Sequence, residues 1–286
     1  MYDFEMVRPA TVREAVDALA HEDAQILGGG QTLIPTMKAR LARMERLVSL
    51  GGITEMRYVR VEEGDGGATL VLGGGTTHAQ AAREAAPHYP ALASLAARIG
   101  DPAVRARGTV GGSLANDDPS ACWPAAALGS GATIVATGKG GAREIEADAF
   151  FVGMFTTALE EGEIVTEVRF PIPRHGAAYE KVLQPASRFP LVAAFVARHG
   201  NGTGDGDGTG EGDGIRVAVT GASQDGVFRW REAEHALAAD FSASALDALD
   251  TPDPQTMIQD LHGTKNYRAH LCRVTAKRAV AGIRER

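Results

Sequence analysis

A run of three glycines, residues 28–30, stands between the short apolar segment Ile26-Leu27 and the hydroxyl residue Thr32. Apolar residues at helical spacing follow from Leu33 to Ala42, so the pattern predicts a strand, a tight turn and the start of a helix. Glycines let the backbone come close to a ligand, and the first N–H groups of a helix have no partner within it. The stretch therefore predicts a turn that holds a diphosphate.

Two better-known phosphate-binding motifs do not fit this stretch. The dinucleotide fingerprint G-x-G-x-x-G needs a glycine where Leu33 stands, and the P-loop needs a Gly-Lys pair, which does not follow Gly30. A strand-to-helix turn that binds no ligand is the simpler alternative for an isolated glycine run, and it stays open at this point.

A second turn of similar composition occurs later in the chain. In Thr109-Val110-Gly111-Gly112-Ser113 two glycines lie between two hydroxyl residues, and we again expect backbone N–H groups to be available to an anion. Two such turns can hold one extended diphosphate from two sides. His78, at the expected start of a helix, is a further candidate, with a helix cap or a surface residue as the alternative.

Composition restricts the kind of partner. The 286 residues carry a formal net charge of −7, which argues against nucleic acid or anionic lipid as the ligand. The two cysteines, Cys122 and Cys272, cannot build a disulfide framework or a four-cysteine metal or iron–sulfur site. No long apolar run and no signal-peptide pattern is present, so we expect a soluble cytoplasmic protein. Any metal redox centre that it serves must then lie on another polypeptide.

Several elements must position these turns. Thr11 and Glu14 have capping-box spacing before a helix that ends at Leu19, and a small β-α-β unit would close with a strand at 46–50. Further strands are expected at 58–61, 68–72, 132–137, 143–146, 163–170, 177–183, 191–198 and 215–220. Helices are expected at 77–86, 90–99, 123–128, 231–239, 242–249 and 266–283.

Three further expectations concern single stretches. Phe150, Phe151 and Phe155 are predicted to lie in the core. Pro171-Ile172-Pro173 is the predicted domain boundary. The Gly- and Asp-rich segment 200–214 cannot bury apolar surface and is predicted to be a mobile hairpin tip; a calcium-binding repeat is the sharper alternative, but the aliphatic residue of that repeat does not recur.

With both glycine turns in place, the chain resembles the FAD-binding medium subunits of the molybdenum hydroxylases, the carbon monoxide dehydrogenase and xanthine dehydrogenase family of flavoproteins. Gly28 to Pro35 is similar to the family's A-G-G-x-[ST]-L-[LI]-P, and Thr109 to Ser113 is similar to its T-[IV]-G-G-[SDN]. Further agreement lies in Ile99-Gly100-Asp101 with Arg105, Thr157 to Ile164, Lys181 to Pro190, and Tyr267-Arg268 with Leu271. The likeness covers nearly the whole chain in family order.

This resemblance implies an α+β fold of the PCMH-type. Residues 1–174 would form the FAD-binding domain, with subdomains at about 1–56 and 57–174. Residues 175–286 would form a C-terminal domain with a three-stranded antiparallel sheet and helices.

The resemblance also implies which residues bind FAD. Residues 26–33 (Ile26, Leu27, Gly28, Gly29, Gly30, Gln31, Thr32, Leu33) and 109–113 would hold the diphosphate, Ile99 and Leu159 would pack on flat rings, and Lys181 would lie near the flavin, unless it is a solvated strand charge. His78 and Asp118 complete the set. Cys122 stands where the family commonly has an Asp that bonds the ribose, and Asp117 or Asp118 is the alternative ligand for that ribose. Phe189 stands where some members have a Tyr beside the flavin.

The implied function is electron transfer, with no catalytic acid or base and no metal on this chain. A small partner subunit with [2Fe–2S] clusters would deliver electrons from a large molybdenum subunit to this FAD, in a dimer of heterotrimers, and FAD would pass them to an external acceptor. A stand-alone FAD-dependent oxidoreductase and a flavin-free scaffold subunit are the alternatives.

Overall fold

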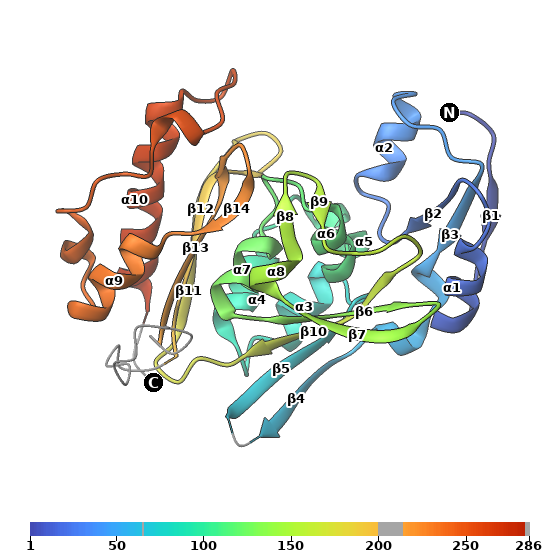
Figure 1. Ribbon diagram of the computed structural model, residues 1–286, viewed down its shortest axis with the longest axis horizontal. Helices are drawn as coiled ribbons and strands as arrows, with labels where there is room; N and C mark the ends of the chain where they lie inside the picture. Colours follow the sequence, from blue (N-terminus) through green and yellow to red (C-terminus); the bar gives the residue numbers. More distant parts are fainter. Residues whose placement is uncertain (65, 200–213, 284–286) are drawn as a thin grey trace.

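The computed structural model describes residues 1–64, 66–199 and 214–283, and it arranges them in layers built on three main sheets (Figure 1). The N-terminal sheet is parallel, in the order β1 (Glu5–Val7), β3 (Arg46–Ser49), β2 (Ala24–Leu27). Helix α1 (Val12–Leu19) connects β1 to β2, and the short helix α2 (Leu33–Lys38) follows β2 after the first glycine turn. Strand β2 therefore ends directly at this turn.

The predicted N-cap of α1 at Thr11 is confirmed, whereas the return bond of the capping box goes to Ala10, one residue before the cap. Thr11 Oγ1 accepts the Glu14 N–H at 3.2 Å, and the Glu14 carboxylate accepts the Ala10 N–H at 2.7 Å. A small hydrophobic cluster fills this N-terminal layer: Ala15, Val48, Leu50, Ile53 and Met56, joined by Ile164 from the neighbouring sheet. The layer thus has a core of its own, with one member from the rest of the molecule.

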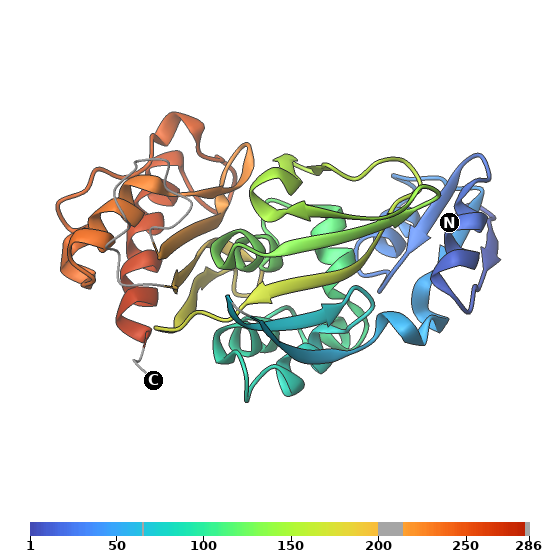
Figure 2. The same ribbon diagram turned by 60° about the horizontal axis from the view of Figure 1, so that its bottom comes forward.

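The central sheet has five antiparallel strands, in the order β4 (Val59–Gly64), β5 (Gly67–Gly73), β10 (Ile164–Pro171), β6 (Thr133–Gly138), β7 (Gly141–Glu146). The helices that follow β5 are α3 (His78–Glu84), α4 (Pro90–Ala97), α5 (Pro102–Arg107), α6 (Val110–Asn116) and α7 (Trp123–Ser130). Helix α8 (Ala147–Phe150) leads into a two-stranded ribbon of β8 (Phe151–Gly153) and β9 (Thr156–Thr157). Viewed from a second direction, the N-terminal layer (blue) and the C-terminal layer (orange and red) lie at opposite ends of the molecule (Figure 2).

The C-terminal sheet is antiparallel, in the order β11 (Ala177–Leu183), β12 (Pro190–Arg198), β13 (Ile215–Ser223), β14 (Gly226–Arg229). On β12 the side chains of Val192, Ala194 and Val196 pack toward α10 (Lys265–Gly282), while those of Ala193, Phe195 and Ala197 join the core that contains α4 and α7. Because both faces are buried, this strand reads as one continuous apolar run. The remaining elements are α9 (Arg231–Ala239) and the 3₁₀ turns η1 (Leu50–Gly52), η2 (Thr54–Met56), η3 (Ala243–Leu246) and η4 (Pro254–Thr256).

The predicted α+β class is confirmed, but several details were wrong. The C-terminal sheet has a fourth strand, β14, and the helix expected at 242–249 is the 3₁₀ turn η3. Phe155 is 57% exposed and adopts φ 55° at the tip of the β8–β9 ribbon, so it is no core residue; Phe150 is buried and Phe151 half-buried. The mobile tip predicted at 200–214 lies, except for Gly214, outside the described residues.

Candidate cofactor-binding site

A cavity of about 1330 Å³ lies where the N-terminal layer meets the central layer. Segments far apart in the sequence line it. They are residues 23–33, the group Gly74, Gly75, Thr77 and His78, several residues between 106 and 121, Thr157, residues 159–165, and Phe189 from the C-terminal layer. Its size exceeds that of most small-molecule pockets, which hold about 300–1,000 Å³. An extended ligand suits such a space.

The first glycine turn supplies unpaired donors to this cavity. Among the residues that the structure describes, the backbone N–H groups from Gly28 to Leu33 donate to no protein acceptor. Gly30 has φ +70°, a conformation that glycine adopts without strain, and it carries the chain from β2 into α2. The run ends at the N-terminus of a helix, where the macrodipole favours negative charge. An anion bound here would accept the hydrogen bonds that these N–H groups otherwise donate to water.

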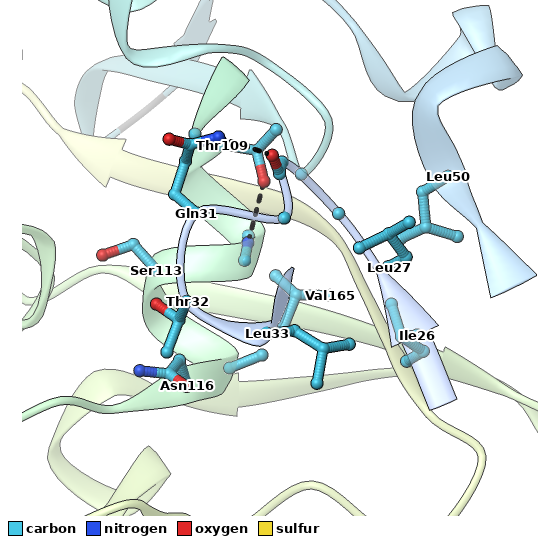
Figure 3. Close-up of a pocket in the computed structure, with 18 of the residues that line it drawn as sticks. Ile26, Leu27, Gln31, Thr32, Leu33, Leu50, Thr109, Ser113, Asn116 and Val165 are labelled. Carbon is cyan, nitrogen blue, oxygen red and sulfur yellow. Dashed lines mark hydrogen bonds between the residues drawn. The ribbon is translucent and has the colours of Figure 1, made fainter. Parts of the chain in front are cut away.

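The second turn lies directly against the first, but its role differs from the predicted one. A Cβ added at Gly28 would lie 3.3 Å from Thr109 Oγ1, so the two turns touch. Figure 3 shows Gln31 and Thr32 of the first turn on the same side as Ser113 and Asn116 of α6.

In the second turn the N–H groups that follow Thr109 already donate to protein acceptors, contrary to the prediction that they are available to an anion. Those of Val110 and Gly111 donate to Thr76 O and Gly74 O at 3.0 and 2.9 Å, and that of Gly112 donates to Thr109 Oγ1 at 3.1 Å (Figure 3). Thr109 caps α6, which uses the donors that the composition suggested were free. The second turn thus offers close backbone approach and the Ser113 hydroxyl.

A third glycine turn, Gly73–Gly75, contributes to the site and was not predicted as part of it. Gly74 and Gly75 line the cavity. A Cβ at Gly111 would lie 2.7 Å from Gly74 O, so the second and third turns also pack backbone to backbone. The sequence held a signal, because Gly73-Gly74-Gly75-Thr76-Thr77 repeats the composition of the first turn.

His78 lines the cavity, 5% exposed, as the first residue of α3, so the surface alternative was wrong. Its Nδ1 accepts the indole N–H of Trp123 at 3.1 Å. Since an indole nitrogen only donates, Nδ1 carries no proton and the neutral ring carries its proton on Nε2. Burial, and then the charge of Arg105, lowers the pKa of His78 to about 4. His78 is therefore a neutral hydrogen-bond donor at physiological pH.

We expect nitrogen-15 NMR to show His78 as the Nε2–H tautomer at neutral pH, with protonation near pH 4. Between pH 6.5 and 4 the unfolded chain would bind a proton here that the folded chain does not, so this group's contribution to stability falls as pH falls through that range. A His78→Gln variant assigns the resonances by their loss. Protonation near the ordinary value of 6.5 would contradict the assigned environment.

Asp118 lines the cavity, so its carboxylate is within reach of a ligand there. Its Oδ1 also accepts the Ser120 N–H at 2.8 Å. Asp117, which stood beside it as a possible ribose ligand, is 1% exposed and does not line the cavity. Cys122 is buried one residue beyond the lining residue Ala121. Of the three side chains considered for the ribose, the structure therefore brings Asp118 to the cavity.

Ile99, Leu159 and Phe189 line the cavity as apolar residues, whereas Val110 and Lys181 do not line it. Val110 is fully buried in the core that packs on the central sheet. Lys181 is 5% exposed, so the alternative of a solvated strand charge was wrong. Its ammonium lies behind the wall of the cavity and bonds backbone carbonyls there.

Comparison with known proteins gives the same picture over the whole chain. A family model described as "FAD binding domain in molybdopterin dehydrogenase" matches residues 2–173. The carbon monoxide dehydrogenase medium chain of Afipia carboxidovorans is 34% identical, over 99% of this chain and 97% of that relative. The nicotine 6-hydroxylase medium subunit of Paenarthrobacter nicotinovorans is 31% identical, over 96% of both chains. This chain belongs to the FAD-binding medium subunits of the molybdenum hydroxylases.

Solved structures agree with that assignment. A chain of the reconstituted CO dehydrogenase from Oligotropha carboxidovorans superposes with a TM-score of 0.85 at 32% identity, covering 99% of this chain and 98% of the other. The PCMH-type fold, the oxidoreductase class and FAD as the cofactor of this medium subunit are thereby confirmed. Within the described ranges, no helix combines the length and apolar character that a membrane span requires.

Proposed function

We propose that this medium subunit carries electrons from an iron–sulfur partner to an external acceptor. A small subunit would hold [2Fe–2S] clusters and a large subunit would oxidise substrate at a molybdenum centre, assembled in the cytoplasm as a dimer of heterotrimers. FAD suits this position because it takes electrons singly and releases them singly or in pairs. The domain division at about residue 174, with a further division near 56, belongs to the same proposal.

The single observation that most favours FAD binding is the run of unpaired N–H groups from Gly28 to Leu33. A diphosphate is large and anionic enough to accept several of them, and the capped helix α6 brings the Ser113 hydroxyl to the same space. His78 would donate from Nε2, and Asp118 would be the acceptor for a ribose hydroxyl. These residues fit the cofactor that the family match assigns.

The apolar part of the cavity fits the rings of FAD. Ile99 and Leu159 would pack on flat faces, while Phe189 would contact a ring without donating a hydrogen bond. The buried ammonium of Lys181 would add positive charge behind this wall, which favours the anionic reduced flavin. The chain's own contribution is thus to bind, to orient and to set the local potential.

Purification tests the proposal directly. We expect a yellow protein with absorbance near 450 nm, the general position for oxidised flavin. Native mass spectrometry should find it with a two-cluster iron–sulfur protein and a molybdenum subunit. A colourless protein that takes up no added FAD would favour the scaffold alternative, and a yellow protein that turns over a substrate without partners would favour the stand-alone oxidoreductase.

A further inference from the structure

Lys181 bonds three chain segments at one buried point. It stands on β11, and its Nζ donates to Arg98 O at 2.7 Å and to Arg188 O at 2.8 Å. Its third contact is Cys122 Sγ, at 3.8 Å. We name this group of contacts the Lys181 junction. The residues that it joins lie at the end of α4, in the loop between β11 and β12, and at the start of α7.

Each contact of the junction is one residue away from the wall of the cavity. Arg98 precedes Ile99, Arg188 precedes Phe189, and Cys122 follows Ala121; all three neighbours line the cavity. A carbonyl oxygen and the next residue's Cα belong to the same planar peptide group. Bonds to Arg98 O and Arg188 O therefore fix the Cα atoms of Ile99 and Phe189 at the same time.

Neighbouring bonds hold the same two wall residues from other sides. Arg105 Nη1 donates to Ile99 O at 2.9 Å and to Gly100 O at 2.8 Å. The ring of Phe189 packs edge-on against His262, with centroids 5.6 Å apart. Without Lys181, Ile99 would keep its Arg105 bond, whereas the loop carrying Phe189 would lose its tie to α4.

The chemistry of the junction suits a positioning role. A buried ammonium is costly unless its donors are satisfied, and here two carbonyls and one sulfur receive them. Among the described residues, no carboxylate lies within ion-pair distance of Lys181, whereas its neighbour Arg98 pairs with Glu180 at 3.3 Å. A salt bridge between strands is therefore not the reason for this lysine.

We propose that Lys181 is a positioning residue that sets the separation of Ile99 and Phe189, and thereby the shape of the apolar wall against which the cofactor's ring lies. The part that concerns the ring rests on the proposed function. The part that concerns the loop between β11 and β12 rests on the chain alone.

Trypsin provides a readout that needs no cofactor. Arg188 is exposed, and the peptide bond after it carries the carbonyl that Lys181 holds. In a Lys181→Met variant, which keeps the length of the side chain and removes its donors, we expect cleavage after Arg188 to be about tenfold faster by peptide mass spectrometry. FAD affinity, measured by flavin fluorescence, should weaken by about tenfold. Lys181→Arg keeps donors and should restore most of both.

The matched control is Lys277→Met. Lys277 lies on α10 and bonds Asp247, which follows η3, and neither residue lines the cavity. This variant should leave both readouts unchanged. Equal cleavage in wild type and Lys181→Met would overturn the proposal, and so would a Lys181→Met chain that has lost its whole fold, because the inferred role is local. If the wild type bound no FAD, the proposed function would fail, while the cleavage rates would still decide the role of Lys181.

Discussion

Gly29→Ala is expected to lower the affinity for FAD by about 100-fold, which corresponds to ~2.7 kcal/mol. A Cβ at this position would lie 2.6 Å from Gly108 Cα and still closer to the carbonyl of Arg107, and backbone cannot yield as the end of a side chain does. The first turn must then move away from Arg107 and Gly108, which displaces the N–H groups from Gly28 to Leu33. Fluorescence titration with FAD measures the loss.

Gly140→Ala is the matched control for this substitution. Gly140 lies in the turn between β6 and β7, and a Cβ there meets nothing within 4 Å. We expect its FAD affinity and its melting temperature to equal those of the wild type. Wild-type affinity in Gly29→Ala would refute the assignment of the first turn as the diphosphate site.

Asp117→Asn is expected to stabilise the protein at neutral and alkaline pH. Asp117 is 1% exposed, and neither carboxylate oxygen has a hydrogen-bond partner among the described residues. Burial, and then the charge of Asp118, raises its pKa to about 7 from 3.8. The folded chain therefore keeps a proton that the unfolded chain has lost, and stability falls as pH rises from about 4 to about 7.

The amide cannot ionise, so the variant escapes this loss. Asn also tolerates the left-handed conformation of Asp117, which has φ 40°. We expect a gain on the order of 2 kcal/mol at pH 8, or a melting temperature higher by about 4–8 °C, and a smaller gain at pH 5. Differential scanning calorimetry at both pH values checks this, with Asp250→Asn at an exposed position as the control. A gain that does not depend on pH would contradict the buried, unpaired carboxyl.

Local signals in the sequence predicted the parts of the fold that local physics decides. The N-cap at Thr11 and the left-handed turn at Gly30, where a Cβ would meet only Leu27 and Ile34, depend on neighbours in the chain. The helix α6 was not predicted, because Gly111 and Gly112 are poor helix formers. The helix contains glycine at position 111 because the backbone of Gly74 lies too close for a side chain there.

Long-range contacts explain the other differences. Whether Lys181 is solvated depends on Arg98 and Arg188, which pattern along β11 cannot show. In the second glycine turn, composition could not tell that Thr76 and Gly74 accept the N–H groups of Val110 and Gly111. The resemblance to a family predicted that the cofactor is FAD, whereas the hydrogen-bond partner of each N–H group and of Lys181 is known only from the structure.

The small core of the N-terminal layer has a consequence for biogenesis. Its cluster takes one member, Ile164, from the central sheet, and the cavity occupies much of the junction between the two layers. A ligand in that cavity would contact both layers and stabilise their packing. Without it, we expect residues 1–50 to open as a unit while the rest of the chain stays folded. Amide hydrogen exchange in residues 1–50 should then be faster in the FAD-free chain than in the FAD-loaded chain. Loading of the flavin would then serve as a checkpoint of maturation, because a subunit still lacking it would present an opened N-terminal layer to proteases before it reached its partners.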